Sequence, residues 1–440
     1  MKNALLRTLT VGLTLTVATA AQALVRIDLT DANADPVPVA LVDFTGKTPD
    51  EVQLGKDIKN LIKTNLKNSG LFNTIDDKAF LQTPASIQAN GPAFSQWRLI
   101  NAQALVVGTV EITPDAKGGK LRAVYRMFDV YGEEQMIGKA YTASVQFWRH
   151  IGHRISDDIY SRITGEGGYF TTRIVFIGEQ RVRNRTLKRL CVMDQDGGNY
   201  QCLTDGRHLV LTPRFSPAAQ QIIYMSYANG KPRLYLLDLP TGKQEIVGDF
   251  EGLNSSPRFS PDGKSLLMTL TMGHEGNPEI YRMDLKTRKL ERLTFHRGID
   301  TSPAFSPDGK QIVFNSDRGG KPALYIMDAD GNRVRRLTFG DGRYYAPAWS
   351  PRGDLIAFVK EKSGRFSIGV IEADGSEERL LTDSYLDESP SWSPNGRVII
   401  FARQKGDTDR LHTIDLTGYN ERRLETPTDA SDPAWSPLLQ

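Results

Sequence analysis

Histidine and cysteine are both scarce in this sequence, which has six histidines and two cysteines among its 440 residues. So few histidines leave little material for a Ser-His-Asp triad or a histidine-rich metal site. The G-x-S-x-G, H-E-x-x-H and Walker-type glycine motifs are also missing. We therefore expect no catalytic residue, no cofactor-binding residue and no metal ligand, and we expect that the protein is not an enzyme.

An excess of charge of either sign is missing as well. The 55 Lys and Arg residues nearly balance the 52 Asp and Glu residues, which leaves a formal net charge of +3. A nucleic-acid-binding protein normally shows a clustered basic surface. We expect no nucleic-acid partner, no small-molecule substrate and a monomeric protein.

Long apolar runs are absent beyond the N-terminus, and the run at Leu9–Val17 is too short to span a bilayer, which takes about 20 residues. Lys2 and Arg7 precede this run, and Ala21-Gln22-Ala23 follows it as a small-x-small cleavage site. The pattern predicts a signal peptide over residues 1–23, export, and no transmembrane segment in the mature chain.

Residues 24–35 are expected to form a separate N-terminal segment, because a turn-prone stretch with Asp31 and Pro36 follows. Val25, Ile27 and Leu29 alternate as in a strand. This segment is either a frayed terminus or a strand that pairs with the edge of a sheet.

Residues 36–168 alternate strand-like and helix-like patterns, which predicts an α/β domain. Thr48 and Glu51 form a capping box before a helical apolar stripe that ends at Gly70. The other expected elements are strands at 37–44, 71–75, 104–112, 121–130 and 135–141, and helices at 92–101 and about 147–163.

From residue 172 onward a five-residue phrase of the form P-x-(F/W)-S-P dominates the sequence. Its first prolines are separated by 44, 46, 44, 43 and 43 residues, a period typical of propeller blades. Four short strand patterns fall within each period. The six copies are Pro213–Pro217, Pro257–Pro261, Pro303–Pro307, Pro347–Pro351, Pro390–Pro394 and Pro433–Pro437.

The ends of this repeat region complement each other. Only Leu438–Gln440 follow the last phrase, whereas the region starts with three strand patterns that lack a first strand. We therefore predict an all-β six-bladed propeller over residues 172–440, closed by its C-terminal strand.

The phrase itself is interpreted as structural, because repeated aromatic residues usually form a repeated core. The variable residues just before each phrase are expected to form loops at one mouth of the central channel, where propellers often bind partners. They could equally be ordinary solvated turn residues. The candidate partner-binding residues at this mouth are Asn254, Ser256, Asp300, Thr301, Tyr344, Tyr345, Asp387, Glu388 and Asp432.

Cys191 and Cys202 are eleven residues apart, which in an exported protein predicts one local disulfide between neighbouring strands. His150 and His153 resemble a metal pair, but the pattern shows no third ligand, so we expect both to be solvated. The two Asp-x-Asp-Gly stretches at 194–197 and 328–331 lack the later residues of a calcium loop, so turns are expected there.

The order of these parts, the FSPDGK stretches at Phe259–Lys264 and Phe305–Lys310, and the terminal PAWSP resemble the TolB family of the Tol–Pal system. The resemblance implies a non-enzymatic periplasmic adaptor that supports outer-membrane integrity and cell division. It implies that the lipoprotein Pal binds at the propeller mouth, with Thr301 and Asn254 as the first candidates. It also implies that TolA binds the mature N-terminus, at Leu24, Val25, Arg26, Ile27, Asp28 and Leu29.

Two other classes stay open from the residues alone. A propeller-type hydrolase or lyase would need a cluster of His, Arg and acidic residues in the channel, and the sequence does not show one. A glycan-binding module is the other alternative.

Overall fold

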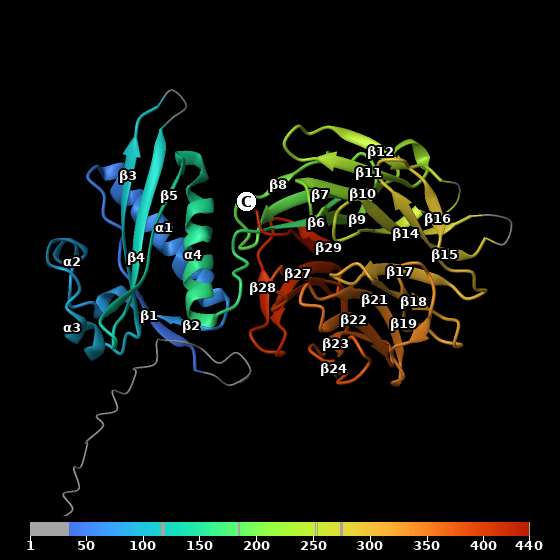
Figure 1. Cartoon of the computed structure of the whole chain (residues 1–440). Helices are drawn as coiled ribbons and strands as arrows, with labels where there is room; N and C mark the ends of the chain where they lie inside the picture. Colours follow the sequence, from blue (N-terminus) through green and yellow to red (C-terminus); the bar gives the residue numbers. More distant parts are fainter. Residues whose placement is uncertain are drawn as a thin grey trace, which may run out of the picture.

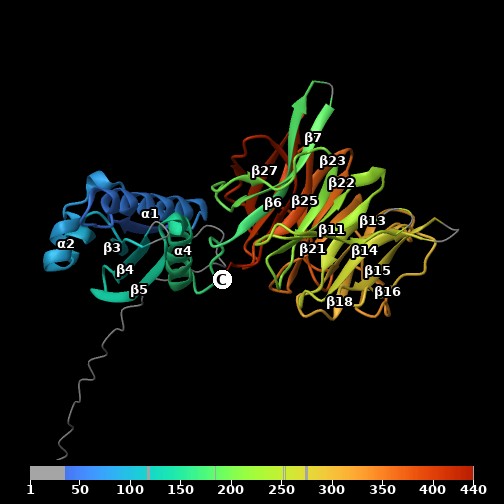
Figure 2. The same cartoon turned by 90° about the horizontal axis from the view of Figure 1, so that it is seen from above.

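The computed structural model describes residues 35–115, 119–183, 185–250, 252, 254–272 and 276–439. The predicted signal peptide and the proposed TolA-binding residues Leu24–Leu29 lie outside the described residues. Figure 1 shows two domains side by side, an α/β domain followed by a strand-rich, propeller-type domain, with the C-terminal end of the chain between them. Figure 2 shows the same arrangement from above.

The α/β domain is built on a five-stranded sheet of order β2-β1-β3-β4-β5. Strand β1 is parallel to both β2 and β3, while β3, β4 and β5 form an antiparallel meander. The elements are β1 (Val37–Leu41), α1 (Pro49–Asn68), β2 (Phe72–Thr74), α2 (Pro84–Asn90), α3 (Phe94–Leu99), β3 (Ala104–Thr113), β4 (Lys120–Asp129), β5 (Glu134–Ser144) and α4 (Trp148–Thr164).

Helix α1 starts where the capping box predicts. The Thr48 hydroxyl accepts from the Glu51 amide at 3.3 Å, and the Glu51 carboxylate accepts from the Thr48 amide at 3.0 Å. The apolar stripe of α1 packs with that of α4 on one face of the sheet. The start and the apolar face that the sequence predicts for this helix are therefore the ones found in the structure.

The helix predicted over residues 92–101 is present as the shorter α3, but a second short helix just before it, α2, was not predicted. Gly91 lies between the two helices with a left-handed φ of 77°. The missed signal was Thr83-Pro84, since Thr83 caps α2 and Pro84 opens it. Both helices pack against the sheet face opposite α1 and α4, around the buried Trp97.

The second domain consists of four-stranded antiparallel groups. Its strands are β6 (Arg173–Val182), β7 (Arg185–Asp194), β8 (Gln201–Cys202), β9 (Val210–Phe215), β10 (Gln221–Ser226), β11 (Arg233–Asp238), β12 (Gln244–Gly248), β13 (Asn254–Phe259), β14 (Ser265–Thr271), β15 (Pro278–Asp284), β16 (Leu290–Arg292), β17 (Asp300–Phe305), β18 (Gln311–Ser316), β19 (Ala323–Asp328), β20 (Arg335–Arg336), β21 (Arg343–Trp349), β22 (Leu355–Lys362), β23 (Arg365–Glu372), β24 (Arg379–Leu380), β25 (Leu386–Trp392), β26 (Val398–Lys405), β27 (Thr408–Asp415), β28 (Arg422–Leu424) and β29 (Asp429–Trp435).

The C-terminal strand β29 pairs antiparallel with β6, the first strand of this domain, in a sheet of order β29-β6-β7-β8. The groups β21–β24 and β25–β28 are joined by a single parallel bridge between Phe366 and Leu386. No sheet closed on itself occurs among the described strands, and the six-bladed closed ring stays a prediction.

The two domains share a polar interface that includes His153, and the expectation that this histidine is solvated was wrong. His153 is 3% exposed, and its Nδ1 lies 3.0 Å from the Asn65 Nδ2 donor. Asn65 also donates to Ser156 and accepts from Gln195 of the second domain, at 2.9 Å each. The helical pattern of α4 could not reveal this burial, because the residues that contact His153 come from distant segments, Asn65 of α1 and Asp194 of the second domain.

The segment between the domains is held by Asp157 of α4. Its carboxylate accepts from the backbone amides of Phe170 and Thr171 at 2.7 and 3.0 Å. Phe170 and the neighbouring Tyr169 are buried, and Tyr169 packs edge to face on Trp435 of β29. The linker is therefore part of a core common to both domains.

Candidate partner-binding site

The repeated phrase lies on six strands, and each is the first, or inner, strand of its four-stranded group. These strands are β9, β13, β17, β21, β25 and β29. Each contacts the next in sequence order, and β29 also contacts β9. Side chains of the phrase line a cavity of about 360 Å³, including Phe215, Phe259, Phe305, Trp349, Trp392 and Trp435. The structure therefore brings the six copies of the phrase together.

The serine of the phrase anchors the turn that follows. The Ser306 hydroxyl donates to Asp308 at 2.6 Å and accepts from the Gln311 amide at 2.9 Å. Ser260 makes the equivalent bonds to Asp262 and Ser265. The aromatic residue packs between neighbouring sheets, as Trp392 does against residues of β22. These contacts support the structural interpretation of the phrase.

A bulge interrupts every one of these strands at the residue before the first proline of the phrase. These residues have φ between 46° and 56°, although none is a glycine. The sequence does not predict this conformation, because a residue before proline is normally extended. A bulge re-aims the side chains around it. The six positions are Thr212, Ser256, Ser302, Ala346, Ser389 and Asp432.

Three of the candidate residues are not displayed at the mouth, which corrects the sequence-based expectation. Asp300 and Asp387 are fully buried and pair with Arg318 and Arg403, each at 2.7 Å. Tyr344 is also fully buried, and its hydroxyl bonds to Glu378 at 2.8 Å. The predicted loops are the first residues of inner strands, so alternate side chains point into the sheet packing.

The other candidates keep accessible surface, apart from Asn254, whose side chain lies outside the described residues. Ser256, Thr301, Tyr345 and Asp432 are half-buried, and Glu388 is exposed. Asp432 accepts from the Ser389 hydroxyl at 3.0 Å and from the Thr212 amide at 3.3 Å. It therefore ties its own strand to the inner strands on both sides.

An acidic hollow of about 210 Å³ opens beside these residues. It is lined by Glu179, Glu388, Asp409 and Asp432, with Lys188 as its basic residue. Although the Glu388 side chain keeps exposed surface, partial desolvation of its carboxyl group in this hollow, together with the charges of Asp432 and Asp409, raises its pKa. Lys188 neutralises Glu179 at 2.8 Å, so the remaining acids give this part of the mouth a negative potential.

Three exposed aromatic residues on the same side were missed by the sequence analysis. Phe295, Phe339 and Tyr385 are 75%, 74% and 72% exposed and lie in the connections that lead into β17, β21 and β25. The Arg292 and Arg336 guanidinium groups stack on the two phenylalanine rings. The repeated Arg-Leu-Thr-Phe stretch was the available signal. Exposed aromatic and Arg side chains are typical of protein interfaces.

One cluster of metal-ligand types exists among the described residues, formed by His153, Asp194 and Asp196. Arg149 already pairs with both carboxylates, at 3.2 Å for Asp194 and 2.6 Å for Asp196. His153 Nδ1 accepts from Asn65, which places the proton of a neutral ring on Nε2. This cluster is therefore a domain contact rather than a prepared metal site.

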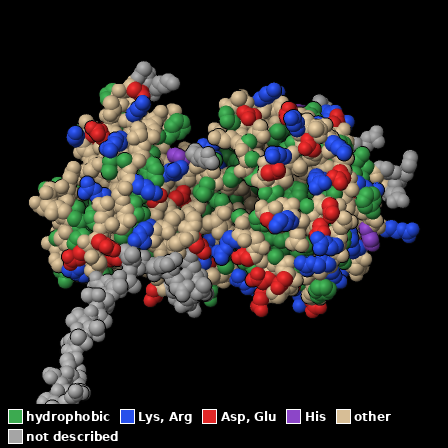
Figure 3. All heavy atoms as spheres, in the orientation of Figure 1, with side chains coloured by type: hydrophobic (Ala, Val, Ile, Leu, Met, Phe, Trp, Pro, Cys, Tyr) green, Lys and Arg blue, Asp and Glu red, His purple; other side chains and the backbone are tan. Residues whose placement is uncertain are grey.

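Figure 3 shows acidic and basic side chains intermixed over the visible face of both domains. In the described part of the chain, none of the helices combines the length and the apolar character that a membrane crossing requires.

Comparison with known proteins matches both domains of the chain to one family. Residues 25–136 match the TolB amino-terminal domain, and residues 160–439 match the TolB beta propeller domain. The chain is 51% identical over 233 residues to the Tol-Pal system protein TolB of Paramagnetospirillum magneticum, which covers 53% of this chain and 51% of the relative. The match thus spans about half the length of this curated relative.

A solved structure extends the likeness to nearly the whole chain. The crystal structure of TolB from Acinetobacter baumannii superposes with a TM-score of 0.82 at 32% identity, covering 92% of this chain and 97% of that one. Together with the domain matches, this establishes the family: the chain belongs to the TolB family of the Tol–Pal system.

Proposed function

We propose that this chain is a non-enzymatic periplasmic adaptor that joins Pal to TolA. The observation that carries the proposal is the match to a TolB structure over both domains and almost all of the chain. In this proposal the second domain is a six-bladed ring closed by β29, and the adaptor supports outer-membrane integrity and envelope constriction during division.

Pal binds in this proposal at the side of the propeller where the six inner strands begin. That side presents the half-buried Thr301 and Tyr345 together with the exposed rings of Phe295, Phe339 and Tyr385. Large exposed aromatic side chains around a channel mouth offer apolar contact area with little loss of conformational entropy. The mouth therefore offers a partner both exposed aromatic rings and polar groups such as Thr301.

TolA binds in this proposal to residues 24–35, at the N-terminal end of the mature chain. The support is the strand-like alternation of Val25, Ile27 and Leu29, which suits pairing with the edge of a sheet in a partner. A second binding segment, separate in the sequence from the residues of the propeller mouth, would let one protein hold two partners. A docked or released N-terminal segment would then change the affinity for Pal.

The first test measures the binding of the soluble domain of Pal by calorimetry. Thr301→Arg places a large charged side chain at the start of β17, and we expect at least about a tenfold loss of affinity. Thr287→Arg is the matched control, because Thr287 is exposed in the turn between β15 and β16, at the opposite end of its sheet. Equal affinities of the two variants would exclude the mouth as the Pal site.

The second test deletes residues 24–35 and measures both partners. Binding of TolA should be lost, whereas Pal should still bind with a changed affinity. Retained TolA binding would contradict the assignment of this segment. An unchanged Pal affinity would contradict the coupling between the two surfaces.

A further inference from the structure

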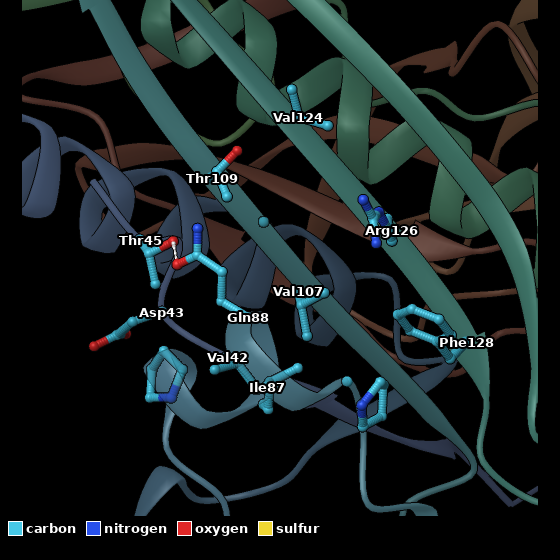
Figure 4. A pocket seen from close by; sticks show the side chains of 14 residues that line it. Val42, Asp43, Thr45, Ile87, Gln88, Val107, Thr109, Val124, Arg126 and Phe128 are labelled. Atoms are coloured by element: carbon cyan, nitrogen blue, oxygen red, sulfur yellow. Dashed lines mark hydrogen bonds between the residues drawn. The ribbon is translucent and has the colours of Figure 1, made fainter. Parts of the chain in front are cut away.

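A cavity of about 190 Å³ lies in the α/β domain, far along the chain from the propeller mouth. It lies on the sheet face opposite α1 and α4, where α2 packs against β3 and β4. Figure 4 shows the side chains that line it, which come from the end of β1, from α2 and from the two long strands. Nothing in the proposed adaptor function uses this cavity.

The walls of the cavity are mostly apolar. Val42 and Ile87 belong to the small buried core around Trp97, and Val107 and Phe128 are packed against that core. Val124 continues the apolar wall along β4. The cavity is therefore a place where the edge of this core opens to solvent, and apolar surface of this kind favours an apolar ligand group.

The rim of the cavity carries one cation without a counter-ion. Arg126 lines the cavity and makes no ion pair or hydrogen bond with any residue that the structure describes. Its cross-strand neighbours in register are Val107 and Gly138, so neither adjacent strand places an acid opposite it. The one acid that lines the cavity, Asp43, is neutralised by Lys59 of α1 at 2.6 Å.

The other polar groups of the rim can also donate hydrogen bonds. The Thr45 hydroxyl donates to Gln88 Oε1 at 3.0 Å, which turns the Gln88 amide so that its nitrogen is available as a donor (Figure 4). Thr109 adds a hydroxyl on the neighbouring strand. A cationic guanidinium, an amide N–H and a hydroxyl beside apolar walls match a ligand with a carboxylate at one end.

We propose that this cavity binds a carboxylate that carries an apolar group about the size of one large side chain. Its volume is below the roughly 300 Å³ at which ordinary small-molecule pockets begin, so it suits one compact apolar group. Arg126 would hold the carboxylate through two parallel N–H···O bonds, and Val42, Ile87, Val107 and Phe128 would cover the apolar group. Both a free branched-chain acid and the C-terminal residue of a peptide have this chemistry.

The test follows the methyl NMR signals of Ile87, Val107 and Val124 in the full mature chain. The probes are 4-methylpentanoate, 4-methylpentan-1-ol, and an acetylated tripeptide that ends in leucine with either a free or an amidated C-terminus. We expect saturable shifts with the two carboxylates, and affinities at least about tenfold weaker for the alcohol and the amide. The stronger of the two carboxylates identifies the source of the ligand.

Arg126→Gln should weaken both carboxylates about tenfold and leave the alcohol unchanged. Arg122→Gln is the matched control, since Arg122 is exposed on the same strand and face but lies outside the cavity, opposite Glu111. Val107→Phe, which narrows the cavity, should weaken all probes. Absence of saturable shifts in the unmodified chain, or equal affinities of the Arg126 and Arg122 variants, would overturn the proposal.

Discussion

At the scale of single residues, the six inner strands share a left-handed backbone conformation that the repeated phrase does not predict. The residue before each first proline is left-handed and non-glycine, which costs about 1 kcal/mol or more at each position. Hydrogen bonds between neighbouring inner strands offset this cost, as in the contacts of Asp432 with Ser389 and Thr212. The bulge therefore persists because adjacent sheets determine it together.

The stability of the protein is expected to depend on pH through Glu388. Partial desolvation in the acidic hollow and the charges of Asp432 and Asp409 raise the folded pKa of Glu388 above the ordinary value of 4.5, so folding favours the neutral form. The contribution of Glu388 to the free energy of unfolding is complete below pH 4.5, where the residue is neutral in both states. It is lost as the pH rises through the raised pKa of the folded protein. Glu388→Gln, which stays neutral, should therefore raise the melting temperature at pH 7 but not at pH 4.

Thermal unfolding of the variant and of the unmodified protein at the two pH values checks this expectation. Glu134→Gln, at an exposed glutamate that begins β5, serves as the control and should show little dependence on pH. The same change in melting temperature at both pH values for Glu388→Gln would contradict the prediction.

At the scale of elements, the sheet β29-β6-β7-β8 is held by more than its backbone ladder. A disulfide joins Cys191 of β7 to Cys202 of β8, and the two residues are partners in register. Strand β8 is only two residues long, so few ladder bonds attach it to β7. The covalent link is therefore the main attachment of this outermost strand.

Replacing both cysteines by alanine should lower the free energy of unfolding by about 2–3 kcal/mol, because the unfolded chain regains the freedom of an eleven-residue loop. Denaturant unfolding monitored by tryptophan fluorescence measures the loss. A reducing agent should destabilise the unmodified protein by a similar amount and leave the double variant unchanged. Equal sensitivity of both proteins to the reducing agent would refute this account.

At the scale of the whole molecule, the last strand connects distant parts of the chain. Trp435 of β29 donates to Thr172 at 2.8 Å and packs on Tyr169, so it touches both the start of the propeller-type domain and the linker. The shared core includes Ile159 and Tyr160 of α4 as well. The orientation of the two domains thus depends on the end of the chain.

Trp435→Ala should lower the free energy of unfolding by about 3–5 kcal/mol, because it leaves a cavity in this shared core. Trp349→Ala is the comparison, since Trp349 holds the same place in its phrase but is only partly buried, against a single local cluster. Denaturant unfolding of both variants provides the measurement. A smaller loss for Trp435→Ala than for Trp349→Ala would contradict this role.

The sequence by itself determined the repeated strands of the second domain and the local features of single elements. The period of the phrase predicted the propeller-type domain, the capping box placed the start of α1, and the spacing of Cys191 and Cys202 placed a hairpin disulfide. Each of these follows from contacts within one strand, helix or turn, whose spacing along the chain is fixed by backbone geometry.

Only the tertiary structure decided which side chains are buried between elements. The sequence pattern placed three buried residues at the propeller mouth. These residues, Asp300, Asp387 and Tyr344, instead pair with partners in their own or adjacent sheets. The sequence pattern predicted a solvated His153, but Asn65 of α1 and Asp194 of the second domain contact its ring and the side chain is buried. Burial of this kind depends on where distant segments lie, and a single sequence pattern carries no record of that placement.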